Sequence, residues 1–200
     1  MRILIIGGNG TIGKRLAVHF GKNHEVLIAG RHSGDYTVDI AQTSSIEALF
    51  SKIGQLDAII CAAGEAKWAN FDDLTEEDFH IGLRSKLMGQ VNLVRIGKGH
   101  VNKGGSITLT SGILADDPVA MTTSAAMVNG GLHSFVKSVV LDLKQPLRIN
   151  VVASGLVEDA VDRYQEYFPG HHPIPMEKML RGYIRSVDGK GTGEIIRIYE

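Results

Sequence analysis

The chain has 200 residues, of which 44% are apolar, 22% charged and 6% aromatic, a composition typical of one globular domain and not of a disordered or fibrous chain. Its 21 basic and 22 acidic residues give a formal charge of -1, which excludes the strongly basic surface of a nucleic-acid-binding protein, and the opening apolar run Ile3 to Ile6 is far too short to span a membrane. The single cysteine, Cys61, excludes a disulfide scaffold and fits a reducing compartment, so we expect a cytoplasmic protein that binds neither nucleic acid nor membrane.

Short apolar runs alternate with segments of helical periodicity along the whole chain. The runs predict six strands, at 3–6, 25–29, 57–61, 106–110, 148–153 and 194–199, and a seventh, very short strand near 37–39. Helices are predicted at 12–20, 44–52, 75–97 and 124–143, the third of which opens with the capping sequence Thr75-Glu76-Glu77-Asp78. This alternation predicts an α/β fold with a doubly wound parallel sheet, the Rossmann fold, in a single domain over residues 1–200.

The stretch 157–185 breaks the alternation after the sixth predicted strand. It contains three prolines, Pro169, Pro173 and Pro175, and the adjacent pair His171-His172. Because ligands of doubly wound sheets bind beyond the carboxyl ends of the strands, we expect a substrate loop or lid here. Two adjacent histidines in an extended loop point apart and lack a clear third ligand, so we expect no metal site.

The first predicted strand leads directly into a glycine-rich turn and then into a helix. Gly7, Gly10 and Gly13 have the spacing G-x-x-G-x-x-G in this strand–turn–helix context. Glycine permits a tight turn and a close approach of the backbone to a diphosphate, and the helix N-terminus offers free N–H groups to the phosphates. The pattern predicts a dinucleotide site, against the alternative of a merely tight turn. The residues expected to form it are Gly7, Asn9, Gly10, Thr11, Ile12 and Gly13.

The end of the second predicted strand indicates which dinucleotide is bound. An acidic residue at this place is typical of an NAD site, but here Gly30 occupies it and Arg31, His32 and Ser33 follow. A guanidinium binds a phosphate through two hydrogen bonds, and a serine hydroxyl adds a further contact. We therefore predict NADP as the cofactor, with NAD less favoured. The alternative is that Arg31 is only a solvated surface residue.

Together these motifs resemble the short-chain dehydrogenase/reductase family over nearly the whole chain. The turn Gly7 to Gly13 is similar to the family's cofactor loop, and Val38-Asp39-Ile40 to its adenine-contacting acidic position. Cys61-Ala62-Ala63-Gly64 stands where the family has Asn-Asn-Ala-Gly, and Gly155 to Val157 follow a strand similar to the one before its Pro-Gly turn. The resemblance implies a small-molecule substrate, a homodimer or homotetramer, and further cofactor contacts from Asp39, Ile40, Cys61, Ala62, Ala63, Gly64, Gly155 and Val157.

The family's catalytic motif, Tyr-x-x-x-Lys, is missing. In the helix that resembles the catalytic one, the tyrosine position falls on Ala125 and the lysine position on Asn129. Ser111 stands at the position of the catalytic serine, and Lys86 at that of the family's structural asparagine. On a helical wheel Lys86 lies within about 20° of an apolar stripe, so either it faces a cavity or its ammonium extends to water. The stripe consists of Phe79, Leu83, Leu87 and Val94.

We predict that Lys86, Ser111 and Asn129 form a rearranged catalytic cluster at the nicotinamide end of the cofactor. Ser111 would donate a hydrogen bond to the substrate oxygen, Asn129 would bond the nicotinamide ribose, and Lys86 would polarise or protonate the same oxygen if burial lowers its pKa. Tyr164 or Tyr167 of the expected lid could supply a substitute hydroxyl. The prediction is an NADP(H)-dependent oxidoreductase of short-chain dehydrogenase type that acts on a small carbonyl or alcohol. The alternative is a non-catalytic NADP(H) sensor or scaffold.

Overall fold

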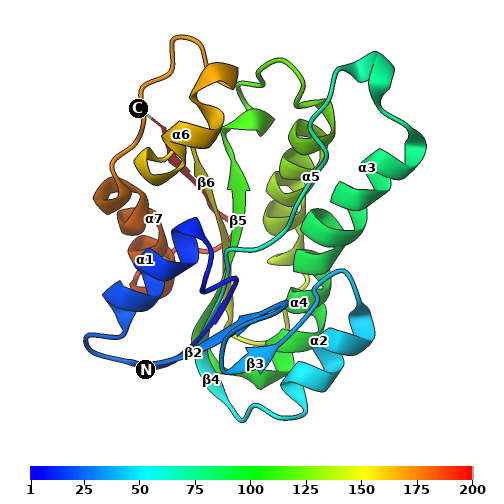
Figure 1. Ribbon diagram of the computed structural model, residues 1–200. Coiled ribbons are helices and arrows are strands. Elements are labelled where there is room, and N and C mark those ends of the chain that lie inside the picture. Colours follow the sequence, from blue (N-terminus) through cyan, green and yellow to red (C-terminus); the bar gives the residue numbers. More distant parts are fainter. Residues whose placement is uncertain (200) are drawn as a thin grey trace.

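The computed structural model describes residues 1–199, and its centre is one sheet of seven parallel strands (Figure 1). The strand order is β3-β2-β1-β4-β5-β6-β7, so the direction of winding reverses between β1 and β4. The strands are β1 (Arg2–Ile6), β2 (Glu25–Gly30), β3 (Tyr36–Thr37), β4 (Leu56–Cys61), β5 (Val101–Gly112), β6 (Arg148–Ser154) and β7 (Ile195–Ile198). This architecture confirms the predicted doubly wound α/β fold, and of the seven predicted strands only the one near 37–39 is displaced, to Tyr36–Thr37.

Helices cover both faces of the sheet (Figure 1). Helices α1 (Thr11–Phe20) and α7 (Met176–Asp188) pack on one face, and α2 (Thr43–Phe50), α4 (Gly89–Gly97) and α5 (Thr123–Val139) pack on the other. Alternate residues of β1 enter the two cores, because Ile3 and Ile5 face α1 and α7 while Leu4 and Ile6 face the other layer. None of the helices formed by residues 1–199 is long and apolar enough to cross a membrane.

Helix α7 corrects the expectation that 157–185 is irregular throughout. Its residues Met176, Met179, Tyr183 and Val187 follow a helical spacing and are each at most 4% exposed against the sheet. Irregular backbone is confined to 157–175, which contains only the short helix α6 (Val161–Tyr164) and 3-10 turns. The expected lid therefore shortens to these residues, and its role in substrate binding remains a prediction.

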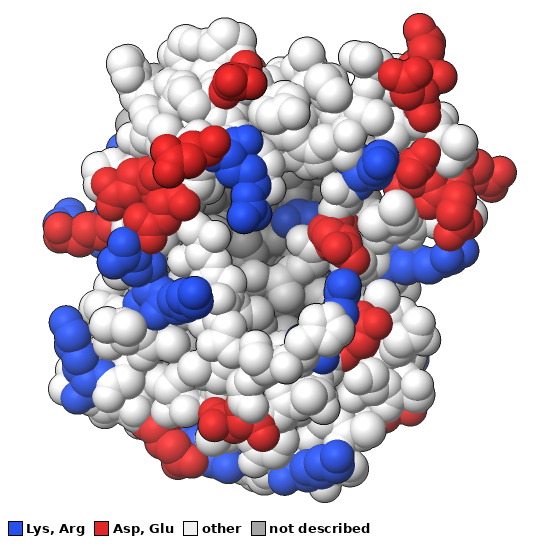
Figure 2. Space-filling view, viewed as in Figure 1, with Lys and Arg blue, Asp and Glu red and all other residues white. Residues whose placement is uncertain are grey.

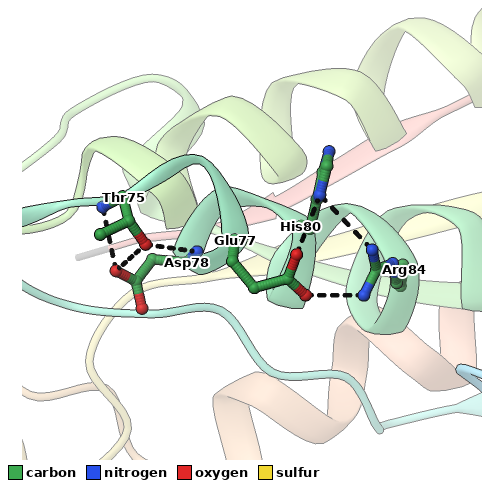
Figure 3. Close-up of polar contacts among 5 residues, drawn as sticks. All are labelled: Thr75, Glu77, Asp78, His80 and Arg84. Carbon is green, nitrogen blue, oxygen red and sulfur yellow. Dashed lines mark hydrogen bonds and ion pairs between the residues drawn. The ribbon is translucent and has the colours of Figure 1, made fainter.

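The single helix predicted over 75–97 is divided into three parts. Helix α3 (Glu76–Gly82) begins at a capping box, in which the Asp78 N–H donates to Thr75 Oγ1 at 3.3 Å and the Thr75 N–H donates to Asp78 Oδ2 at 3.0 Å (Figure 3). A π-helical segment, Leu83–Met88, follows and leads into α4. A π turn adds one residue to a helical turn and so redirects the side chains around it, often at a functional site.

Candidate functional site

A cavity of about 690 Å³ lies at the carboxyl ends of the central strands. Thr11 and Ile12 line it after β1, Ala62 and Gly64 after β4, and Ser154 and Gly155 around the end of β6. A second cavity of about 190 Å³ shares Gly64 with the first and extends to Gly7 and Ile40. Figure 2 shows a hollow on this face of the molecule with Lys and Arg side chains at its rim and inside it. We call the two spaces the large and the small cavity.

Close backbone contacts fix the glycine turn between β1 and α1. Gly7 has a φ of +80°, and a Cβ there would lie 2.7 Å from the Ala62 carbonyl oxygen. A Cβ on Gly13 would lie 2.0 Å from the Gly7 carbonyl oxygen, so α1 packs against the turn more closely than any side chain allows. Of the predicted turn residues, Gly7, Thr11 and Ile12 line a cavity, whereas Asn9, Gly10 and Gly13 shape the turn.

The residues after β2 surround the small cavity. Its lining includes Arg31, His32, Asp39, Ile40 and Ala63, all predicted cofactor contacts. The Arg31 guanidinium donates to Glu65 at 2.9 Å and lies 3.9 Å from Asp39. Ser33 is outside the cavity, where its hydroxyl accepts a hydrogen bond from Asn9 Nδ2 at 2.8 Å. A Cβ on Gly30 would lie 2.7 Å from the Ser33 carbonyl oxygen, so the place of the NAD-typical acid excludes every side chain.

Cys61 does not line either cavity. Its side chain is fully buried in the core, and this burial raises the pKa of the thiol to about 11, as expected of an unreactive cysteine. The structure therefore gives no support to the predicted cofactor contact by its side chain, whereas Gly155 and Val157 do line the large cavity. Within residues 1–199 no group of three or more His, Cys, Asp or Glu side chains is placed to hold a metal ion.

Three separate elements bring Lys86, Ser111 and Asn129 to the large cavity. Lys86 comes from the π-helical segment, Ser111 from the end of β5 and Asn129 from α5. Burial lowers the pKa of the Lys86 ammonium. Asn129 is 3% exposed, and its Oδ1 has no hydrogen-bond partner among residues 1–199. Since buried polar atoms are nearly always hydrogen-bonded, this oxygen marks a place where a ligand can donate a hydrogen bond.

At the positions that the resemblance implies, Lys86 and Asn129 are exchanged relative to the family pattern. The family's lysine position holds Asn129 and its asparagine position holds Lys86, while α5 packs directly against the π-helical segment. The contact is close, because a Cβ on Gly131 would lie 3.0 Å from Leu87 Cδ2. The cavity thus keeps one ammonium and one carboxamide, although each is carried by the other helix.

His133 is a site residue that the sequence analysis missed. Its Nε2 lies 2.8 Å from Ser111 Oγ, and both side chains are at most 7% exposed. Burial lowers the pKa of the imidazole, against the opposing effect of the Asp116 carboxylate. One sequence signal could have revealed His133: it follows Ala125 and Asn129 at intervals of four residues and so lies on the same face of the helix.

Gln90 fixes the strand end that carries Ser111. The side chain is fully buried, accepts a hydrogen bond from the Thr110 N–H and donates one to the Thr110 carbonyl oxygen, each at 2.9 Å. These two bonds continue the ladder of β5 beyond its last pair with β4. Gln90 therefore positions both Ser111, the next residue of β5, and the helix that follows Lys86.

We expect Gln90→Ala to lower the free energy of unfolding by about 2–4 kcal/mol, because it leaves two buried backbone groups without partners. Urea denaturation followed by circular dichroism would measure the change. Asn92→Ala is the matched control, since the Asn92 amide only donates to Thr43 Oγ1 at 3.2 Å and accepts from Arg95 at the partly exposed surface of α4. Equal effects of the two substitutions would contradict the role assigned to Gln90.

The fold and this site define a class of doubly wound α/β proteins with a ligand cavity at the carboxyl edge of the sheet. A family model described as enoyl-(acyl carrier protein) reductase matches residues 18–174. A short chain dehydrogenase of Claviceps purpurea (strain 20.1) is 31% identical over 197 residues, covering 84% of this chain and 75% of that protein. The chain belongs to the short-chain dehydrogenase/reductase family of oxidoreductases.

Solved structures agree with this assignment. The protein lin1944 from Listeria innocua superposes with a TM-score of 0.97 at 41% identity, and the match covers 100% of both chains. A small-chain dehydrogenase crystallised in complex with NADPH superposes with a TM-score of 0.87 at 26% identity, covering 100% of this chain and 96% of the other. The resemblance recognised in the sequence is thereby confirmed.

Proposed function

We propose that the protein is an NADP(H)-dependent oxidoreductase that interconverts a small carbonyl compound and its alcohol in the large cavity. One observation carries the proposal: Lys86, Ser111 and Asn129 line the same cavity as Thr11 and Ile12 of the glycine turn. Polar groups that can act on a carbonyl oxygen thus face the space where a dinucleotide held by the turn would place its reactive end. The NADPH complex of the related small-chain dehydrogenase supports the choice of cofactor. When bound, NADP(H) supplies or accepts a hydride at its nicotinamide ring.

The residues present fit an anionic dinucleotide. The glycine turn leaves its backbone open to a diphosphate, and Asn129 Oδ1 is free to accept a hydrogen bond from a ribose hydroxyl. Three cationic side chains line the large cavity, whereas its lining has one acidic side chain, Glu65. The cationic residues are Lys67, Lys86 and Arg163. The positive potential of this lining favours a phosphorylated ligand.

Ser111 and His133 provide a route for the proton, and Lys86 provides a positive charge beside it. During alcohol oxidation the substrate O–H proton passes to Ser111 Oγ, while Ser111 gives its own proton to the neutral His133 Nε2. Carbonyl reduction reverses both transfers and starts from the protonated imidazole. The Lys86 ammonium polarises the substrate oxygen and stabilises negative charge that develops on it. In this arrangement a lysine and a serine–histidine pair replace the missing tyrosine.

A panel of carbonyl compounds with NADPH, and of alcohols with NADP⁺, tests the proposed function. The expected result is turnover followed by the absorbance of NADPH, together with micromolar or tighter binding in calorimetry. Tight cofactor binding without turnover of any compound would instead favour the non-catalytic sensor or scaffold. Absence of nicotinamide nucleotide binding would contradict both candidate functions.

Arg31→Ala is expected to weaken NADPH binding by about 10- to 100-fold and NADH binding far less, because a charge-assisted phosphate contact contributes about 1.5–3 kcal/mol. The Arg31 guanidinium donates a hydrogen bond to the Glu65 carboxylate, which would compete with a phosphate for it. Glu65→Gln should therefore strengthen NADPH binding and leave NADH binding unchanged. Calorimetry with both nucleotides measures the two affinities. Equal weakening of NADPH and NADH in Arg31→Ala would contradict recognition of the 2'-phosphate.

The lowered pKa of His133 predicts a pH-dependent contribution to stability. Folding favours the neutral imidazole, so the contribution is fully present above the unfolded pKa of about 6.5 and is lost as the pH falls through the lower folded pKa. The charged groups acting on the ring are Asp116, Arg197 and Lys137. The difference in unfolding free energy between wild type and His133→Gln should therefore decrease from neutral to acidic pH in urea titrations. Groups common to both proteins cancel in this difference, and a constant value would contradict the assignment.

A further inference from the structure

One part of the lining of the large cavity is built from aromatic rings. The chain contains six phenylalanines, five tyrosines and one tryptophan, and four of these twelve side chains line this cavity. Trp68 follows β4, and the other three belong to the segment around α6, more than ninety positions further along the chain. We call this set the aromatic wall, and it consists of Trp68, Tyr164, Tyr167 and Phe168.

Trp68 is the centre of the aromatic wall. Its ring centroid lies 5.1 Å from that of Tyr164 in a tilted pair and 5.4 Å from that of Tyr167 in an edge-to-face pair. Phe168, whose ring centroid lies 6.3 Å from that of Trp68, is only 5% exposed, whereas Trp68 and the two tyrosines are half-buried. The contacts among the rings therefore fix the aromatic wall in place, and part of the ring surface remains accessible from the cavity.

Aliphatic side chains extend the apolar surface of the aromatic wall. Ile113, Leu114 and Leu156 also face the cavity, so this part offers few hydrogen bonds to a ligand but much flat and apolar surface. The polar groups proposed to act on the substrate oxygen, Lys86 and Ser111, line the same cavity. A ligand that satisfies both parts has one oxygen function attached to a flat, apolar body.

We propose that the aromatic wall binds the ring of an aromatic carbonyl compound or of the corresponding aryl alcohol, and that Trp68 is the side chain on which this ring packs. The proposal rests on the proposed function, because the oxygen of the substrate is directed to Ser111 and Lys86. Aromatic pairs contribute about 0.5–1.5 kcal/mol beyond the burial of their area. An aryl ketone should consequently bind about 2- to 12-fold more tightly than its saturated-ring counterpart.

Trp68 is the single tryptophan of the chain, so its indole N–H gives one resolved signal in a nitrogen-15 correlation spectrum of the protein. The experiment titrates acetophenone and, as the matched control, cyclohexyl methyl ketone, both into the free protein and into the protein saturated with NADP⁺. The expected result is a saturable shift of the indole signal, with acetophenone binding more tightly. Trp68→Leu should bring the affinity for acetophenone down to that for the saturated ketone, and Trp68→Phe should restore most of it. For these variants the affinities are measured by calorimetry.

Each other outcome overturns the proposal in an identifiable way. Equal affinities for the two ketones, or no binding of either, would mean that the aromatic wall serves only as packing. A loss of NADP⁺ affinity in Trp68→Leu as large as its loss of acetophenone affinity would assign the wall to the cofactor instead. Failure of the proposed function would give a different result: acetophenone would still bind more tightly than the saturated ketone, but no compound would be turned over.

Discussion

Replacing Lys86 with methionine is expected to slow turnover of a carbonyl substrate by about 100- to 1,000-fold, the range typical of removing one preorganised group that stabilises developing charge, and to leave NADPH affinity nearly unchanged. Of the three cationic side chains that line the cavity with Ser111 and Asn129, Lys86 is the one that is not exposed, and the resemblance puts the family's tyrosine position at Ala125, which has no proton to give. Methionine keeps the length and apolar stem of the lysine while removing the ammonium. The Lys86→Met rate therefore measures what the charge contributes.

Two measurements separate this effect from damage to the fold. The Lys86 side chain is desolvated and has no ion pair within residues 1–199, so its removal should leave the melting temperature unchanged or higher. Lys67→Met is the matched control, because Lys67 lines the same cavity but is exposed. Turnover that is unchanged in Lys86→Met would remove Lys86 from the mechanism. An equal loss in both variants would assign the effect to the overall positive potential.

Gly13→Ala is expected to lower the affinity for NADP⁺ by at least about 100-fold, which corresponds to the loss of two charge-assisted hydrogen bonds. The new methyl group would lie 2.0 Å from the Gly7 carbonyl oxygen, so the turn has to move away from α1 and the backbone N–H groups no longer converge on the diphosphate. The same displacement should lower the free energy of unfolding by about 1–3 kcal/mol, as overpacking does elsewhere.

Gly10→Ala is the control within the same turn. A Cβ at this position would lie 3.2 Å from the same carbonyl oxygen, a contact that a small adjustment relieves. We expect its NADP⁺ affinity to fall much less than that of Gly13→Ala in calorimetry. If Gly13→Ala binds NADP⁺ as tightly as Gly10→Ala does, the turn does not hold the diphosphate, and the cofactor site proposed here is wrong.

The sheet could be predicted from the sequence because apolar strands and their spacing are local signals. Two helices had no prediction, the single turn α6 and the longer α7. Helix α7 follows a proline-rich stretch, and its buried stripe is built mainly from methionine and tyrosine. Its spacing was nevertheless helical, with Met176, Met179, Tyr183 and Val187 on one face. The prolines of 169–175 are a local signal and indicated irregular backbone. The burial of α7 depends on its contact with the sheet, which the local sequence does not show.

The candidate site was predictable in part. Ser111 and Asn129 could be placed from the family pattern, and both line the cavity as the alignment implies. The wheel that located Lys86 assumed a regular α-helix, although the residue lies in a π-helical segment, which packs against α5. Two contacts could not be predicted, because they join residues that are far apart in the sequence. They are the hydrogen bond between Ser111 and His133 and the ring contact between Trp68 and Tyr164.

The π-helical segment Leu83–Met88 also bears on how this lineage can change. Deleting the codon of Leu87 or Met88 would restore regular α-helical pairing and rotate the preceding residues by about 100° relative to α4, which Gln90 anchors to β5. Lys86 would then turn away from Ser111, although the glycine turn and the sheet stay intact. If Lys86 acts as proposed, a deletion of one residue would therefore be enough to convert a catalytic protein into one that only holds a nucleotide.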